Sequence, residues 1–165
     1  MLYFIVINPI PAVILTLTAD DNTLLRIDFG AQRPANAIEK ATPILTLAAQ
    51  QLEEYFHGLR RDFTIPLKAN GTQFQQQVWQ ALTHIPYGTT HTYKELAETI
   101  GKPKASRAVG SACNRNPLPI VIPCHRVIGS NHLLTGFAGG LDAKRRLLEI
   151  EAEQKQHNVD FQIRK

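Results

Sequence analysis

The hydrophobic period of the chain changes at residues 68–71, KANG, and this change limits what the chain can fold into. Three short apolar runs precede it, separated by turn residues, as is typical of strands in a small antiparallel sheet. These runs are LYFIVI at 2–7, AVILTLTA at 12–19 and TLLRIDF at 23–29. After the change, apolar residues recur at helical spacing. We therefore predict an α+β chain of two domains, residues 1–71 and 72–165.

Two more elements are expected in the first domain. Residues 44–59, ILTLAAQQLEEYFHGL, carry apolar side chains near helical spacing, and Gly58 is a typical helix stop. Residues 62–67, DFTIPL, are interpreted as one further strand. The first domain then combines a small antiparallel sheet with a helix.

The second domain is predicted to be mainly helical. A Thr72 cap opens a helix at 72–85, in which Trp79 is expected to be a core residue, and PYGTT at 86–90 ends it. Two short helical stretches follow at 92–101 and 102–116, with Pro103 placed in the first turn of the second. A Gly-containing connection between two short helices is typical of a helix-turn-helix, although many small helical proteins contain such a corner.

The second of these helices has an unusual composition. Its middle is made of small residues, while long cations lie along it at Lys102, Lys104, Arg107 and Arg115. Small residues let a backbone approach closely, so the helix fits a groove of a polyanion. The same residues also fit a helix that packs tightly on its neighbour and points Arg107 to solvent. Both interpretations remain open at this stage.

Charge is unevenly distributed along the 165 residues, whose formal net charge is +4. Residues 1–71 hold six Lys/Arg against seven Asp/Glu, whereas residues 72–150 hold nine against four. A basic second part fits a polyanionic partner and fits a solvated basic face equally well.

The compartment and the membrane question follow from the cysteines and the first residues. Cys113 and Cys124 lack the paired spacing of a structural zinc site, so reduced thiols in a cytoplasmic protein are expected. Cys113 is interpreted as a buried small hydrophobe. The first seventeen residues carry no charged side chain, but Pro9 and Pro11 interrupt them and no basic segment precedes them. We expect neither a membrane span nor an export signal.

Residues 120–129, IVIPCHRVIG, hold the strongest candidate for chemistry. Ile120–Ile122 is interpreted as a buried strand. On a regular strand Cys124 and His125 would face opposite ways, but Pro123 argues against a central strand there. The segment is therefore expected to leave the sheet, with the thiol at a pocket floor and the imidazole behind it.

A buried thiol is unreactive unless a base takes its proton, and the base needs an acid to hold its far nitrogen. The candidate acids are Glu149, Glu151 and Glu153, and spacing alone does not choose between them. The nearby run Lys144–Arg146 is interpreted as a solvated helix face that could also hold phosphates.

Three segments of the chain resemble one family closely. PCHRVIG at 123–129, SRAVGSACNRNP at 106–117 and FQQQVWQALTHIPYG at 74–88 resemble the O6-alkylguanine-DNA alkyltransferases, which are suicidal DNA repair proteins. The resemblance runs from about residue 74 to 151 and continues more loosely into the first domain. It implies an RNase H-like first domain and a DNA-binding second domain with a helix-turn-helix.

The resemblance also implies a role for each matching residue. Cys124 becomes the alkyl acceptor, and His125 and Glu151 form a relay to it through water. Tyr93 donates to the base, and Asn116 braces the active-site turn.

Further residues are assigned to DNA and to the base. Arg107 fills the gap left by the extruded nucleotide. The implied DNA-binding residues are Arg107, Ser106, Ala108, Gly110, Ser111 and Lys104, and the implied substrate pocket comprises Pro119, Phe137, Ala138 and Gly139.

The implied partner is double-stranded DNA, bound through the minor groove without sequence preference. The protein is expected to act as a monomer, with clustering on DNA left open. No cofactor or metal is expected. Repair of O4-alkylthymine in addition to O6-alkylguanine is left open.

The chain departs from the family pattern at a few positions. Phe137 stands where a tyrosine is common, and Ala138 also lacks a hydroxyl, which makes the expected pocket more apolar. Ser106 stands where an alanine is often found. The first domain has no Cys/His cluster, so a zinc module is not supported.

Two other functions are weighed against alkyl transfer. An alkyltransferase-like sensor would bind damaged bases without chemistry, but that class lacks the acceptor cysteine. A cysteine hydrolase using Cys124 and His125 would usually take its nucleophile and base from separate segments, and it would leave the basic helix-turn-helix unexplained.

Overall fold

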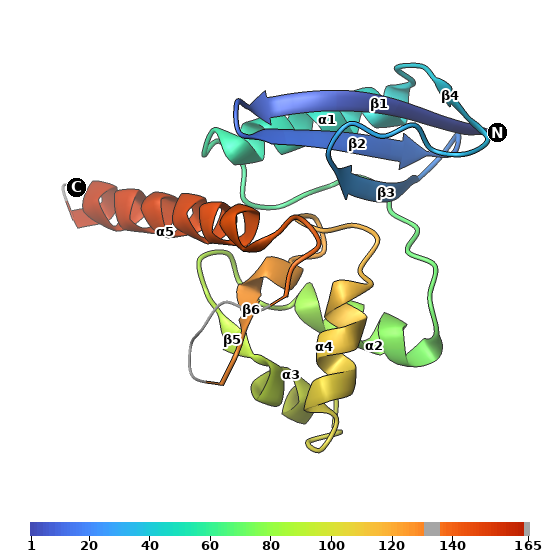
Figure 1. The fold of residues 1–165 in the computed structure, drawn as a ribbon. Helices are drawn as coiled ribbons and strands as arrows, with labels where there is room; N and C mark the ends of the chain where they lie inside the picture. The colour runs from blue at the N-terminus through green and yellow to red at the C-terminus, as the bar shows by residue number, and fades with distance from the viewer. Residues whose placement is uncertain (131–135, 164–165) are drawn as a thin grey trace. The chain divides into compact units, whose positions relative to one another are not determined.

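The computed structural model describes residues 1–130 and 136–163, with side chains as far as residue 154. Its contacts divide the chain into two compact units (Figure 1). The first unit holds residues 1–70 together with 117–121, and the second holds residues 71–116 together with 122–165.

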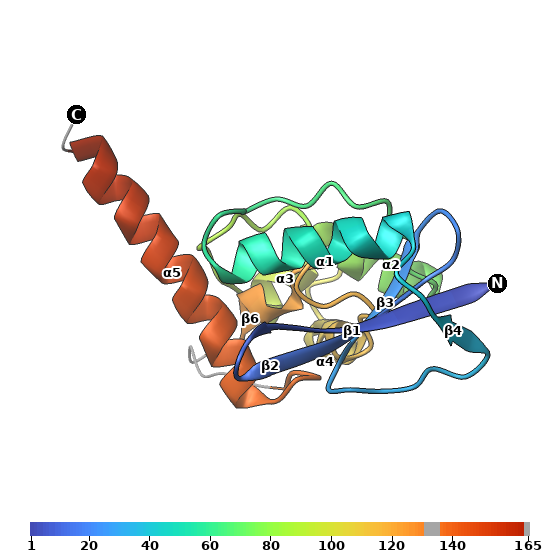
Figure 2. The same ribbon diagram turned by 90° about the horizontal axis from the view of Figure 1, so that it is seen from above.

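The first unit is a four-stranded sheet with one helix. The strands are β1 (Leu2–Ile10), β2 (Val13–Ala19), β3 (Leu24–Phe29) and β4 (Ala37–Glu39), in the order β3-β2-β1-β4. The helix α1 (Pro43–Phe56) packs along one face of the sheet (Figure 2). Gly58 follows it at φ 74°, so the predicted stop is confirmed.

Alternation along the strands decides which face is buried. β2 is almost entirely buried, and its Leu15 and Leu17 have no exposed surface. On the opposite face of β2, Thr16 Oγ1 donates to the carbonyl oxygen of Gly30 at 2.7 Å and accepts from the N–H of Gln32 at 2.9 Å. The loop after β3 therefore satisfies the polar atoms that the second face of the strand would otherwise bury unpaired.

Two expectations for this unit are corrected. The sheet is mixed rather than antiparallel, because β4 pairs parallel to β1. Residues 62–67 do not form a strand; only Leu67 makes a single bridge, to Leu24. Pro66 supplies no N–H, which limits the ladder there, although its carbonyl oxygen accepts from the N–H of Leu24 at 2.8 Å.

A short segment from later in the chain belongs to this first unit. Residues 117–121 lie within the predicted second domain, yet the N–H of Ile27 donates to the carbonyl oxygen of Pro117 at 2.9 Å. The domain limits at residues 71 and 72 stay a prediction.

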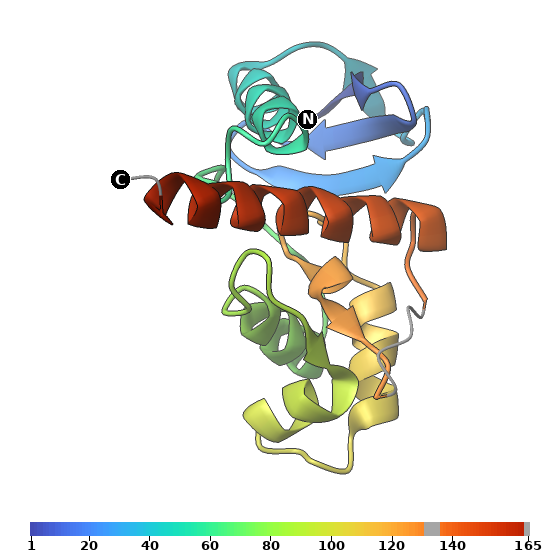
Figure 3. The same cartoon turned by 90° about the vertical axis from the view of Figure 1, so that its left-hand side faces the viewer.

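The second unit is mainly helical. Its elements are α2 (Gln73–Leu82), β5 (His91–Thr92), α3 (Tyr93–Thr99), α4 (Ser106–Asn114), the 3-10 turn η1 (Cys124–Arg126), β6 (Val127–Ile128) and α5 (Leu141–Ile163). β5 and β6 form a two-residue parallel pair, and α5 packs against η1 (Figure 3).

Capping and one buried hydrogen bond fix the helices. Thr72 begins α2 and Thr92 begins α3, each in a reciprocal capping box. Trp79 is buried, and its Nε1–H donates to the carbonyl oxygen of Ala112 at 2.9 Å, which ties α2 to α4. The predicted Thr72 cap and the core position of Trp79 are confirmed.

The connection between α3 and α4 differs in detail from the expectation. Gly101 lies at φ 75°, where a side chain would be strained, and Lys102 N–H donates back to Ala97 O at 2.9 Å. α4 begins only at Ser106, so Pro103 belongs to the connection and not to the first turn of the helix. The residue before a proline disfavours helical dihedrals, which explains the later start.

Candidate active site

The segment before Cys124 turns sharply instead of running as a strand. Ile120 and Val121 form a turn, with Ile120 at φ 76°, so the expected strand at Ile120–Ile122 is wrong. Pro123 has φ −81° and ψ 66°, and the N–H of Cys124 donates to the carbonyl oxygen of Ile122 at 2.8 Å. This is an inverse γ-turn, after which the chain enters η1.

Asn116 supports this turn from the end of α4. It is buried, and its Nδ2 donates to the same carbonyl oxygen of Ile122 at 2.8 Å. The expectation that Cys124 and His125 leave the sheet is confirmed, since both lie in η1.

The side chain of His125 meets one of the three candidate acids. Its Nε2 lies 2.5 Å from Oε2 of Glu151 on α5, and the two side chains are 0% and 1% exposed. Glu149 is instead half-exposed beside Arg146 at 3.7 Å, and Glu153 is exposed. Among the three, only Glu151 can hold His125.

Arg126 completes the surroundings of Glu151. Its Nε donates to Oε1 at 2.9 Å and its Nη2 to Oε2 at 3.1 Å. The N–H of Gly88 also donates to Oε1 at 3.1 Å. Sequence reasoning missed Arg126, although an arginine within an apolar run signals a buried ion pair.

The charges around Glu151 and His125 move both pKa values downward. Burial alone would raise the pKa of Glu151, but hydrogen bonds and charges from His125 and Arg126 lower it to about 2. Burial lowers the pKa of His125, against the opposing effect of Glu151. The pair therefore consists of a carboxylate and a neutral imidazole near pH 7, and Nε2 carries the imidazole proton toward the carboxylate.

The thiol of Cys124 is buried and starts protonated. Burial raises its pKa to about 11, against the opposing effects of a hydrogen bond from Asn116 and the positive charge of Lys144. Sulfur becomes a nucleophile only when a nearby base takes this proton. The neutral ring of His125 is a suitable acceptor.

Lys144 was interpreted as part of a solvated face, and that interpretation is wrong. Its side chain is fully buried, and Nζ donates to the carbonyl oxygen of Val127 at 2.6 Å. Nζ also lies 6.0 Å from the centre of the Tyr93 ring. Spacing carried a signal, because Lys144, Leu147 and Glu151 stand at i, i+3 and i+7 on one helix face.

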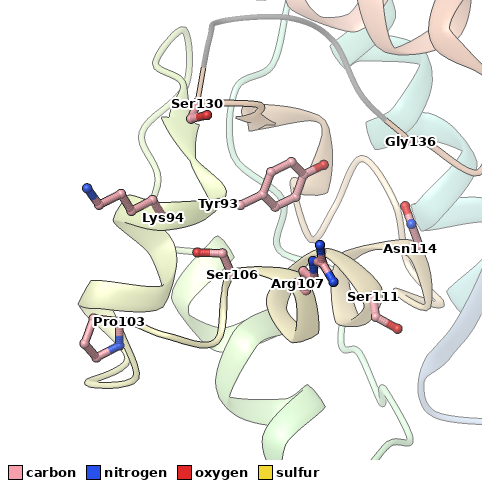
Figure 4. A pocket seen from close by; sticks show the side chains of 10 residues that line it. Tyr93, Lys94, Pro103, Ser106, Arg107, Ser111, Asn114, Ser130 and Gly136 are labelled. Carbon is pink, nitrogen blue, oxygen red and sulfur yellow. The ribbon is translucent and has the colours of Figure 1, made fainter.

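A cavity of about 740 Å³ opens beside the helix-turn-helix (Figure 4). Tyr93 from α3 and Arg107 from α4 face it, with Arg107 exposed. Its lining residues are Tyr93, Lys94, Pro103, Ser106, Arg107, Gly110, Ser111, Asn114, Ser130 and Gly136. Five residues predicted for the base or for DNA thus share one wall.

Other predicted residues lie outside this wall. Cys124 does not line the cavity, and neither do Pro119, Phe137, Ala138 and Gly139. Pro119 is buried within the segment assigned to the first unit. The pocket assignments at these positions stay predictions, and Asn114 and Gly136 are the cavity residues that sequence reasoning missed.

α4 has a buried face and an exposed one. Val109, Ala112 and Cys113 are buried, and burial raises the pKa of Cys113 to about 12, in line with its interpretation as a small hydrophobe. Ala108 and Ser111 are exposed and help line a smaller cavity of about 270 Å³. Tight packing therefore accounts for only one side of the helix.

Basic side chains surround the exposed face of α4. Lys104 and Arg115 are exposed at its two ends. Lys102 donates to Oε1 of Gln77 at 3.2 Å and lies 5.1 Å from the centre of the Phe74 ring. The face combines a small-residue surface with positive charge, as close approach to a polyanion requires.

Searches for metal and membrane features complete the description of the site. Within residues 1–130 and 136–163, no three His, Cys, Asp or Glu side chains gather as metal ligands would. No helix in that part of the chain is both long enough and apolar enough to cross a bilayer.

Comparison with known families finds matches in both units. Residues 73–153 match the DNA binding domain of 6-O-methylguanine DNA methyltransferase, and residues 14–69 match the ribonuclease-like domain of the same enzyme. Together these matches cover most of the chain.

Individual relatives and solved structures agree with that result. The methylated-DNA–protein-cysteine methyltransferase of Methanosarcina barkeri is 50% identical over 92% of this chain and 97% of its own. The constitutive enzyme of Bacillus subtilis is 56% identical over 70% of this chain and 71% of its own. A crystal structure of the Mycobacterium tuberculosis protein in complex with DNA is 41% identical, with a TM-score of 0.83 and 93% of both chains covered.

Proposed function

The chain belongs to the 6-O-methylguanine DNA methyltransferase family, and from this premise we propose that Cys124 accepts the alkyl group from O6-alkylguanine. Its activity is that of a methylated-DNA–protein-cysteine methyltransferase, a DNA repair reaction in which the protein is the acceptor. One observation carries the choice of Cys124: the γ-turn at Pro123 sets this thiol next to the buried pair of His125 and Glu151. Cys113, the other thiol, has no such neighbour on its own element.

The proposed reaction begins with the proton of Cys124. His125 accepts it, directly or through one water, because its Nε2 proton is directed to Glu151 and its other ring nitrogen is the basic one. The resulting thiolate attacks the alkyl carbon, so that a sulfur–carbon bond forms as the bond from carbon to O6 breaks. The electron pair of that bond stays on the guanine.

Tyr93 supplies the second proton of the reaction. Its phenol faces the cavity from the first residue of α3 and donates to the departing guanine, which would otherwise leave as an anion. The phenolate and the protonated His125 then exchange a proton through solvent. Asn116 braces the turn at Ile122 and hydrogen-bonds the Cys124 sulfur.

The lesion has to leave the duplex before sulfur can reach it. We assign Arg107 to the gap that the extruded nucleotide leaves, since it projects from α4 beside the cavity. Ser106, Ala108, Gly110 and Ser111 let the helix approach closely, and Lys104 contacts phosphate. Flipping costs on the order of a few kcal/mol, which the filled gap partly offsets. Insertion of α4 in the minor groove makes contact independent of sequence.

The product is a thioether, which water does not hydrolyse, so each molecule reacts once. The thiolate is the only reagent, and the proposed chemistry involves no cofactor. One chain carries every residue of the proposed site, so the protein acts as a monomer. The cytoplasm, where thiols stay reduced, is the proposed compartment.

Mass spectrometry of the intact protein tests the proposal. After incubation with a duplex holding one O6-methylguanine, the protein should gain the mass of one methylene and no more. Peptide mapping should place the gain on Cys124. Cys113→Ala should still be methylated, whereas Cys124→Ala should bind the duplex without gaining mass. Methylation of Cys124→Ala would overturn the assignment, and bound but unmodified lesion with the native protein would favour the sensor class.

A further inference from the structure

The carboxylate of Glu151 is shared between two basic side chains. His125 contacts Oε2 at 2.5 Å, while Arg126 reaches Oε1 at 2.9 Å and Oε2 at 3.1 Å. Arg126 and Glu151 are nearly or fully buried, with side chains 8% and 1% exposed. In such a place each contact is strong, and the removal of one partner strongly affects the others.

Arg126 is itself held in a fixed orientation. Its Nη1 donates to the carbonyl oxygen of Ile85 at 2.7 Å, and its guanidinium lies 5.6 Å from the centre of the Tyr87 ring. The N–H of Gly88 donates to the same Oε1 that Arg126 holds. The turn at residues 85–88 therefore fixes Arg126 and Glu151 together, and a two-point contact fixes the plane of the carboxylate.

Sharing changes what Glu151 does to His125. A carboxylate that faces only an imidazole draws a proton onto it and favours imidazolium. A carboxylate already paired with a guanidinium has less charge left for the imidazole, but it still orients the Nε2–H. An imidazolium cannot accept the proton of a thiol, so a base next to a buried carboxylate must be kept neutral.

We propose that Arg126 is a positioning residue for the reaction, which takes up part of the Glu151 charge and so keeps His125 neutral at working pH. The inference rests on the proposed role of His125 as the base. It adds a residue that acts through Glu151 and touches neither the alkyl group nor the Cys124 sulfur in the proposed reaction.

The other charged groups near His125 are consistent with this role. Among the described residues, the charges that act on it are Glu151 and Lys144 from α5 and Arg126 from its own turn. Burial, Arg126 and Lys144 lower the pKa of His125, whereas Glu151 raises it. α2 also packs against η1, and its buried residues, Val78, Trp79 and Leu82, do not titrate. Lys144 remains when Arg126 is replaced, so the expected effect is partial.

Arg126→Met is the direct test, with the rate of methyl transfer to Cys124 measured from about pH 5 to about pH 9, where histidine titrates. The acid limb of the profile should move up by about one pH unit, which is about a tenfold loss of rate on that limb. At high pH the rate should recover toward that of the native protein. Arg145→Met is the matched control, because Arg145 is 58% exposed on α5 and pairs with Asp142; its profile should not move.

Arg126→Lys covers the case in which the methionine variant fails to fold. It keeps the charge but loses the two-point contact, so its acid limb should move less than that of Arg126→Met. The ring nitrogen chemical shifts of His125, followed by NMR without DNA, should give the same order of pKa values: native lowest, lysine intermediate, methionine highest.

The outcomes separate the inference from the function on which it rests. An equal loss of rate at every pH, with an unchanged pKa of His125, would make Arg126 merely structural and overturn the inference. Absence of methyl transfer in the native protein would overturn the proposed function instead. The NMR titration would still measure the effect of Arg126 on His125 in that case.

Discussion

The side-chain amide of Asn116 donates to the carbonyl oxygen of Ile122 at 2.8 Å, and the N–H of Cys124 donates to that same oxygen at 2.8 Å. One oxygen thus joins the end of α4 to the γ-turn that presents the thiol. Asn116 also hydrogen-bonds the sulfur and opposes the rise of the Cys124 pKa that burial causes.

Asn116→Ala should slow methyl transfer more than it lowers stability. Loss of one buried donor costs about 1–3 kcal/mol, and the thiol pKa should rise further because the hydrogen bond to sulfur is gone. Single-turnover kinetics and thiol titration with a small alkylating reagent measure the two effects. Unchanged thiol reactivity would limit Asn116 to holding the turn.

Gly71→Ala should destabilise the second unit. A Cβ at this position would lie 2.5 Å from Cη2 of Trp79 and 2.7 Å from Oε1 of Gln75. The indole cannot move freely, because Nε1 is bound to Ala112 O. Overpacking of this kind costs about 1–3 kcal/mol, which urea unfolding would show as a lower midpoint. A native midpoint would mean that Trp79 can shift.

Gly110→Ala should separate stability from repair. Its Cβ would meet only the Tyr93 ring, at 3.8 Å, so the substitution fits and should stabilise α4 by about 0.5–1 kcal/mol. The same methyl group would project from the cavity wall and keep α4 away from DNA. A higher midpoint with weaker duplex binding, measured by fluorescence anisotropy, is expected. Native affinity would remove Gly110 from the interface.

Sequence patterns predicted the elements that their own residues stabilise. β2, α1 and α2 each carry their own period, cap or stop, so local sequence was sufficient. β4 has three residues and exists because β1 lies beside it, a long-range pairing that no local pattern contains. The strand expected at Ile120–Ile122 failed for a related reason. Its apolar residues are buried, but they are buried in a turn.

The site shows the same division. The thiol and the imidazole were evident from their place in an apolar run, whereas the choice among Glu149, Glu151 and Glu153 needed the contact with His125. Lys144 was hidden by its neighbours Arg145 and Arg146, which are exposed as expected. A run of three basic residues on a helix turns about one member in three toward the core, and composition does not mark which one.

Arg107→Ala should reduce repair of a duplex far more than reaction with the free base O6-methylguanine. The free base needs no extrusion, so only the duplex reaction loses the residue that fills the gap, at a cost of about tenfold or more given flipping energies of a few kcal/mol. Arg115→Ala is the control, since Arg115 is exposed at the end of α4 but does not line the larger cavity. Equal losses with both substrates would remove the gap-filling role from Arg107.

Acid should destabilise the folded protein through His125 before it does so through Glu151. Both groups have lower pKa values in the folded state than their ordinary values of 6.5 and 4.5. The unfolded chain therefore binds more protons as pH falls, first at histidine below about 6.5 and then at the carboxylate. The stability from each group is fully present above its ordinary pKa and is lost below it. Urea unfolding between about pH 7.5 and pH 5.5 should show a slope that approaches about 1.4 kcal/mol per pH unit from this histidine alone. His125→Asn, compared over the same range, should show a smaller slope, while an identical slope would place the titrating group elsewhere.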